Sequence, residues 1–103
     1  NMRGVNLTGA DLTGVDLSGV DLNGSNLKEA NLDRAKLHRA NLTRVNLTGA
    51  YLKNADLNEA DLSGAYLNRA NLTEANMKNI RNLDSATKCK TIFSWGEDNS
   101  GCE

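Results

Sequence analysis

The sequence predicts an all-β solenoid, in which the chain winds through stacked square coils. Leucine recurs at every fifth position from residue 7 to residue 72, and a small or β-branched residue stands two positions before each leucine. The residues between are mostly polar, and aromatic residues make up only 4% of the chain, too few for a conventional core of large side chains. Self-similarity at a short, fixed period is typical of repeat architectures.

A period of five fits neither regular helix nor flat strand. On an α-helix, five steps of about 100° would smear successive leucines around the cylinder. On a flat strand, an odd spacing would send successive leucines to opposite faces. A chain that turns by about 90° after each short extended segment aims every leucine at a common axis, and four such segments close one square coil.

In each five-residue unit, i denotes the position of the recurring leucine. The small or β-branched residue is then at i−2, and the turn lies at i+1 and i+2. Seven of the nine glycines stand at i+2, where a permissive backbone is useful. Asn and Asp dominate i−1, which predicts a polar outer wall. Residues 1–79 follow this frame and predict about four coils stacked about 4.8 Å apart. Ser25 interrupts the i−2 positions, and we expect it to be a small polar filler bonded to the backbone.

The five-residue pattern ends after Asn79, so residues 80–103 are expected to form a short irregular or helical C-terminal cap. Solenoids need atypical end units because a bare coil exposes its core. Three residues are expected to close the last coil: Ile80, Leu83 and Ala86. Three more are expected to cover the exposed core, with an aromatic binding patch as the alternative: Ile92, Phe93 and Trp95.

The units carry a family resemblance. Residues 10–14 (Ala-Asp-Leu-Thr-Gly) and 60–64 (Ala-Asp-Leu-Ser-Gly) resemble the A(D/N)LXX motif of the pentapeptide repeat family, and the match runs through residues 1–79. The resemblance implies a right-handed quadrilateral β-helix with positions i and i−2 buried.

Two cysteines stand in the expected cap. Gly96 and Gly101 leave room for the chain to double back between Cys89 and Cys102, and both a bridge and two free thiols remain open. The Cys…Asn-Ser-Gly-Cys ending resembles that of cyanobacterial and chloroplast-lumen pentapeptide repeat proteins, which implies a disulfide between Cys89 and Cys102. A disulfide would indicate an oxidising compartment, the thylakoid lumen or the periplasm. The chain begins inside a repeat, and we expect that a targeting or upstream segment has been removed.

The sequence offers little for catalysis, and we expect no enzyme, cofactor or metal site. The one histidine, His38, stands alone on a polar position, which argues against a zinc site. Asp residues at i−1 face outward, whereas an acid–base pair would need a pKa raised by burial. A net charge of −1 argues against nucleic-acid binding, and no apolar run suggests membrane insertion. The candidate contact surface consists of Tyr51, Tyr66 and Trp95.

Two functions follow as hypotheses. The first is a non-enzymatic structural or protein-interaction module for an unidentified protein partner, with end-to-end self-association as a further option. The alternative is a DNA-mimicking regulator of a topoisomerase of the gyrase type, which resemblance to quinolone-resistance pentapeptide repeat proteins implies. The short rod and the near-neutral charge disfavour the alternative, and residues 25–54 carry six Lys or Arg against two Asp or Glu.

Overall fold

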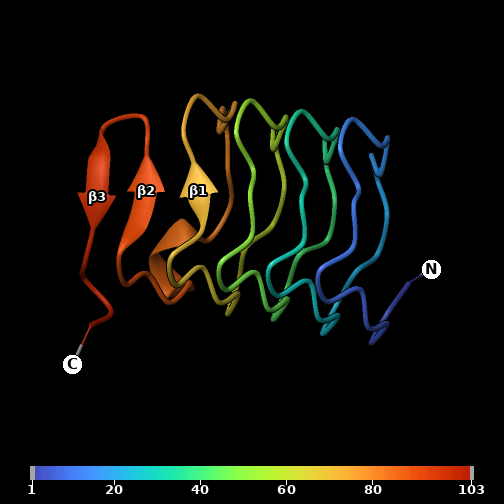
Figure 1. The fold of residues 1–103 in the computed structure, drawn as a ribbon, viewed down its shortest axis with the longest axis horizontal. Coiled ribbons are helices and arrows are strands. Elements are labelled where there is room, and N and C mark those ends of the chain that lie inside the picture. Colours follow the sequence, from blue (N-terminus) through green and yellow to red (C-terminus); the bar gives the residue numbers. More distant parts are fainter. Residues whose placement is uncertain (1, 103) are drawn as a thin grey trace.

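The computed structural model describes residues 2–102 as a stack of square coils (Figure 1). Parallel bridges join residues that are twenty apart, from Asn6 with Asn26 to Asp61 with Arg81. The molecule measures 33 × 23 × 23 Å along its principal axes. Asn1 and Glu103, which open the expected repeat and end the expected cap, lie outside the described residues. The stacked coils confirm the predicted solenoid.

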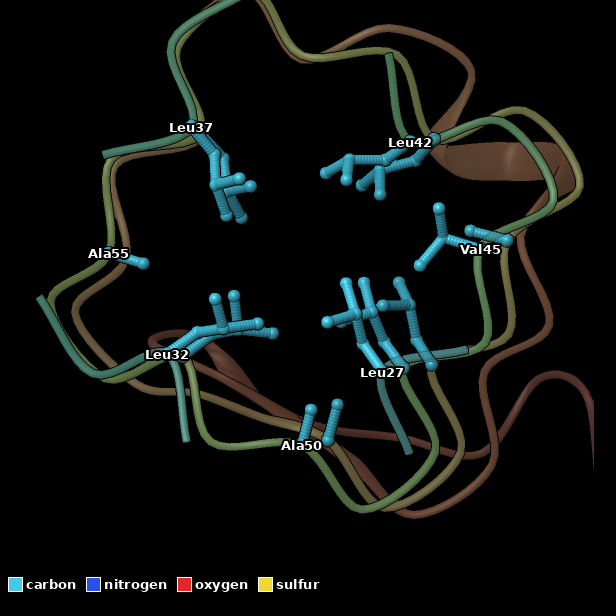
Figure 2. Packing of buried hydrophobic residues seen from close by; sticks show 14 of the residues in the cluster. Leu27, Leu32, Leu37, Leu42, Val45, Ala50 and Ala55 are labelled. Atoms are coloured by element: carbon cyan, nitrogen blue, oxygen red, sulfur yellow. The ribbon is translucent and has the colours of Figure 1, made fainter. Parts of the chain in front are cut away.

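The core is a spine of leucines that point inward, one from each face of a coil (Figure 2). Every frame leucine from Leu22 to Leu72 is at most 1% exposed, and Ala or Val at i−2 fills the space between neighbouring leucines. In the first coil, Met2, Leu7 and Leu17 are only partly buried, because no coil covers them on one side. Burial is therefore complete in the middle of the stack and partial at its N-terminal end.

The corners are formed by the i+2 residues, which are left-handed in all sixteen units, with φ between 56° and 72°. Seven of these residues are glycine, and the other nine are Asn, Arg or Glu, for which this conformation is unfavourable. The stack holds the corners in place: the Gly9 N–H, for example, donates to the carbonyl of Lys28 in the next coil at 2.9 Å.

The polar residue at i−1 has a structural role. In twelve units its side-chain oxygen accepts a hydrogen bond from the N–H of i+1, which has no partner in the backbone ladder. Asn46 accepts from the Thr48 N–H in this way, and Asp61 from the Ser63 N–H, both at 3.0 Å. Asn and Asp dominate i−1 because their short side chains form such local turns.

Ser25 is 1% exposed and bonded to the backbone, as expected. Its hydroxyl donates to the carbonyl of Met2 at 2.6 Å and accepts from the N–H of Val5 at 3.3 Å. Both hydrogen bonds pin the first coil to the second.

The parallel pairing between successive coils continues beyond Asn79, but one extra residue is inserted in the chain. The 3-10 helix η1 (Leu83–Ser85) takes up the extra residue, after which partners are 21 apart, as in the bridge between Tyr66 and Thr87. Strand β1 (Asn71–Leu72) pairs parallel with β2 (Thr91–Phe93), and β3 (Gly96–Asp98) pairs antiparallel with β2 (Figure 1). Residues 86–90 and 91–95 thus form two further units on top of the four coils.

The cap covers the core with Phe93, which is 2% exposed and pairs with Leu72 in the β1–β2 register. The ring of Trp95 stacks on that of Phe93, with centroids 4.5 Å apart. Ala86 is buried, and Ile80 and Leu83 pack against the core. The expected covering role of Ile92 is wrong: Ile92 occupies an outward i−1 position and is 41% exposed. Trp95 covers the ring of Phe93 but is itself 67% exposed, so of the three expected covering residues Phe93 alone is buried in the core.

Two polar residues take core positions in these added units. Lys88 stands where a coil has leucine, is 7% exposed, and donates from Nζ to the carbonyls of Leu83 at 2.8 Å and Ala86 at 3.1 Å. Thr91 is fully buried at i−2, and its Oγ1 donates to the carbonyl of Leu67 at 2.6 Å. Hydrogen bonds to the backbone make these burials tolerable.

Candidate functional site

One corner of the rod differs from a plain polar wall. We call it the Gly49 corner; it consists of four of the turn residues that stack along this edge after Gly9, namely Glu29, Gly49, Arg69 and Lys90. The Glu29 N–H donates to the carbonyl of Thr48, the Gly49 N–H to that of Asn68 and the Arg69 N–H to that of Cys89. These bonds set the four residues one above another.

A groove runs along the Gly49 corner. A hollow of about 480 Å³ is lined by Lys28, Glu29, Thr48, Gly49, Tyr51 and Arg69. A second hollow of about 350 Å³ is lined by Thr48, Asn68, Arg69, Cys89 and Lys90. The two hollows share Thr48 and Arg69, so they adjoin. Glycine opens the groove, because a Cβ at Gly49 would lie only 3.3 Å from Cγ of Glu29.

Two of the three candidate contact residues flank this corner. Tyr51 lines the groove and is 52% exposed, and Tyr66, 48% exposed, lies on the adjacent face in the column Asn46–Tyr66–Thr87. Trp95, 67% exposed, belongs to the cap and stacks on Phe93. The structure therefore places the tyrosines beside one corner and Trp95 in a separate position.

Both tyrosines occupy an i−1 position, where Asn or Asp usually binds the N–H of i+1. Tyr51 cannot accept the Lys53 N–H in this way, and Asp33 of the preceding coil supplies the acceptor instead: its Oδ1 accepts the Lys53 N–H at 3.0 Å. At Tyr66 the N–H of Asn68 has no acceptor among residues 2–102. At Tyr66 a structural hydrogen bond is thus replaced by a half-exposed aromatic ring, whereas at Tyr51 another residue supplies the acceptor.

A disulfide closes the cap next to the groove. Cys89, which lines the second hollow, is bonded to Cys102, and their Cα atoms are 4.8 Å apart. The tail is also held by two hydrogen bonds, from the Lys90 N–H to Asn99 Oδ1 at 2.9 Å and from the Gly101 N–H to the Lys88 carbonyl at 2.6 Å.

The carboxylates of the outer wall act as hydrogen-bond acceptors. The Thr13 hydroxyl and N–H hold the pKa of Asp11 below its usual value, and the Ser18 N–H and hydroxyl do the same for the pKa of Asp16. Asn82 lowers the pKa of Asp61 in the same way. Each of these groups is stabilised as the anion, which does not suit it to act as a general acid near neutral pH.

Other features of residues 2–102 add no further site. No group of three or more His, Cys, Asp or Glu side chains is arranged to hold a metal ion in this range. No helix among the same residues is both long and apolar enough to cross a membrane.

The comparison with known families gives one match. The model for pentapeptide repeats matches residues 1–39, 10–49 and 40–79. No curated protein sequence matches the chain.

Several solved structures are similar to this chain. Rfr23, a pentapeptide repeat protein from the cyanobacterium Cyanothece 51142, is 38% identical with a TM-score of 0.80, over 82% of this chain and 56% of that chain. HetL from Nostoc sp. strain PCC 7120, involved in heterocyst differentiation regulation, is 35% identical with a TM-score of 0.78, over 92% of this chain and 47% of that one. The pentapeptide repeat protein alr5209 from Nostoc PCC 7120 is 39% identical with a TM-score of 0.70, over 85% of this chain and 68% of that chain.

The chain spans about half the length of Rfr23 and HetL. The likeness confirms that the square coils form a right-handed quadrilateral β-helix. The family match, the solved structures and the stacked five-residue units agree: the chain belongs to the pentapeptide repeat family.

Proposed function

We propose that this chain is a non-enzymatic protein-interaction module, a rigid rod that presents Tyr51 and Tyr66 to a protein partner. The proposal rests on one observation: both tyrosines take positions where Asn or Asp would stabilise the coil, and both are about half exposed. Tyrosine is enriched at protein interfaces because it supplies a large, rigid contact area with a polar tip. Tyr66 costs the fold a hydrogen bond, at Tyr51 the acceptor comes instead from Asp33, and neither ring gains much burial, so contact with another molecule best explains both residues.

A non-enzymatic role agrees with the chemistry of the wall, where neighbouring hydroxyl and amide groups lower the pKa of Asp11 and of Asp16. The disulfide between Cys89 and Cys102 supports the proposal that the protein works in an oxidising compartment, such as the thylakoid lumen or the periplasm.

The charge pattern gives no support to DNA mimicry. A surface that imitates duplex DNA needs a continuous run of negative charge, since the duplex carries one charge per about 1.7 Å of its axis. Here the signs alternate along a column, as in Asp16–Lys36–Asp56.

Site-directed photocross-linking tests the proposal. A photoreactive benzoylphenylalanine replaces Tyr51 or Tyr66, and the control replaces Lys36, which is also an outward i−1 residue but lies on another face. In extract of the producing organism, we expect both tyrosine positions to capture the same protein and Lys36 to capture none. That protein, once purified, should bind the rod directly, and Tyr51→Asn should weaken the binding. Capture of nothing, or equal capture from Lys36, would contradict the proposal.

The substitution Tyr66→Asn should stabilise the rod. The new side-chain oxygen can accept the N–H of Asn68, and a hydrogen bond of this kind contributes about 0.5 to 1.5 kcal/mol. Urea titration followed by circular dichroism should therefore give a higher midpoint. The reverse change in the same column, Asn46→Tyr, removes the 3.0 Å bond from the Thr48 N–H and should lower the midpoint. A lower midpoint for Tyr66→Asn would mean that the ring stabilises the fold itself.

A further inference from the structure

Two cations occupy successive rungs of the Gly49 corner. The hydrogen bond from the Arg69 N–H to the Cys89 carbonyl, 2.8 Å long, places Lys90 in the turn directly next to that of Arg69. Neither side chain forms an ion pair or a hydrogen bond with any other residue in the range 2–102. Like charges that face each other on neighbouring strands destabilise a sheet, so this pair is not explained by the fold.

Elsewhere on the rod the charges are arranged differently. Arg39 and Glu59, which are turn residues on successive rungs of another corner, form an ion pair at 3.2 Å. In the column through Asp16, Lys36 and Asp56 each neighbour carries the opposite sign. Within the rungs that the structure describes, Arg69 and Lys90 are the one pair of like charges in direct succession.

Both cations line the groove, where a ligand could contact them. Arg69 lines both hollows and Lys90 lines the second, with the hydroxyl-bearing Thr48 between the hollows and Tyr51 at the wall of the first. The acid in the groove, Glu29, lies on the far side of Gly49 and makes no ion pair with Arg69. The groove is open and elongated along the corner, a shape that suits an extended segment.

We infer that an acidic segment of the protein partner binds in this groove, with a carboxylate held by Arg69 and Lys90 and the adjoining residues packed against Tyr51. The planar guanidinium of arginine matches a carboxylate with two parallel hydrogen bonds. The ligand charge would also relieve the repulsion between the two stacked cations. This inference rests on the proposed function and adds the chemistry of the partner.

Fluorescence anisotropy with a fluorescein-labelled hexaglutamate peptide tests the inference on the whole disulfide-bonded chain at low ionic strength. Hexaglutamate should bind and hexaglutamine should not. Arg69→Asn and Lys90→Asn should each raise the dissociation constant about fivefold, as expected for one ion pair at a surface. Asparagine is used because both positions are left-handed, with φ of 60° and 55°, and asparagine tolerates this conformation.

Matched variants separate the groove from general charge. Arg34→Asn removes a cation from the same turn position at another corner, where φ is 61°, and should leave the affinity unchanged. Gly49→Asn fills the groove and should weaken binding. Gly64→Asn places the same side chain at the neighbouring corner, outside the groove, where its Cβ meets Cγ of Arg44 at 3.2 Å, and should not weaken binding.

The other outcomes overturn the inference. Equal weakening by Arg34→Asn would mean non-specific attraction, and displacement of the peptide by equimolar inorganic phosphate would mean a small-anion site. If hexaglutamate does not bind while Tyr51 still captures a partner, the acidic-segment inference fails and the interaction module stands. If hexaglutamate binds as expected and no position captures a protein, the interaction module fails instead.

Discussion

Leu42→Ala is expected to lower the free energy of unfolding by about 2 to 5 kcal/mol, the range found when a buried leucine is truncated. Leu42 is fully buried in the middle of the stack, where leucines from four faces converge (Figure 2). Coils on both sides hold the surrounding side chains in place, so the cavity cannot close. Leu7→Ala, in the partly exposed first coil, should cost clearly less because less apolar surface is returned to water.

Urea titration of both variants measures the difference, with the slope checked to ensure that the same surface unfolds in each. Leu42→Met serves as the control for volume and should cost less than about 1.5 kcal/mol. Equal losses from Leu42→Ala and Leu7→Ala would contradict a stack in which burial grows from the open end to the middle.

The coil could be predicted from sequence because one short pattern encodes each of its parts. Leucine at i and a small residue at i−2 must share a face, and a period of five leaves a square coil as the arrangement that buries them all. The reason for Asn and Asp at i−1 needed coordinates, since their role is to bind the N–H of i+1. Because of that role, the tyrosines at positions 51 and 66 are exceptions, as is Lys36 at the same position of its unit.

The cap could not be predicted in the same detail. Its units keep the backbone pairing of the coils, but they do not follow the pattern of leucine at i and a small apolar residue at i−2. Lys88 and Thr91 take core positions and are satisfied by hydrogen bonds to carbonyls, which no hydrophobicity pattern reveals. The inserted residue in η1 changes the offset from 20 to 21. Without that offset, Lys90 cannot be assigned a place next to Arg69, so the paired cations of the Gly49 corner were hidden from sequence analysis.

Removal of the disulfide by Cys102→Ser is expected to cost about 3 kcal/mol, as estimated for the closure of a loop of about 15 residues. The bond joins residues 13 apart and holds the tail against the last two units. Its loss leaves the tail attached by a few hydrogen bonds, including that from the Gly101 N–H to the Lys88 carbonyl. We expect the cap to loosen first and the core near Phe93 to become exposed, because a solenoid unit contacts only its neighbours.

Thermal unfolding with and without dithiothreitol measures this effect. The reductant should lower the midpoint of the native protein to that of Cys102→Ser and leave the variant unchanged, and Cys89→Ser should match Cys102→Ser. Gly101→Ala keeps both cysteines but sets a Cβ 2.9 Å from the Lys88 nitrogen, too close for two backbones that lie in contact. The tail must then shift, so dithiothreitol should reduce the Gly101→Ala protein faster than the native one. Equal rates would mean that the disulfide alone, and not the close fit of Gly101 against Lys88, holds the tail on the rod.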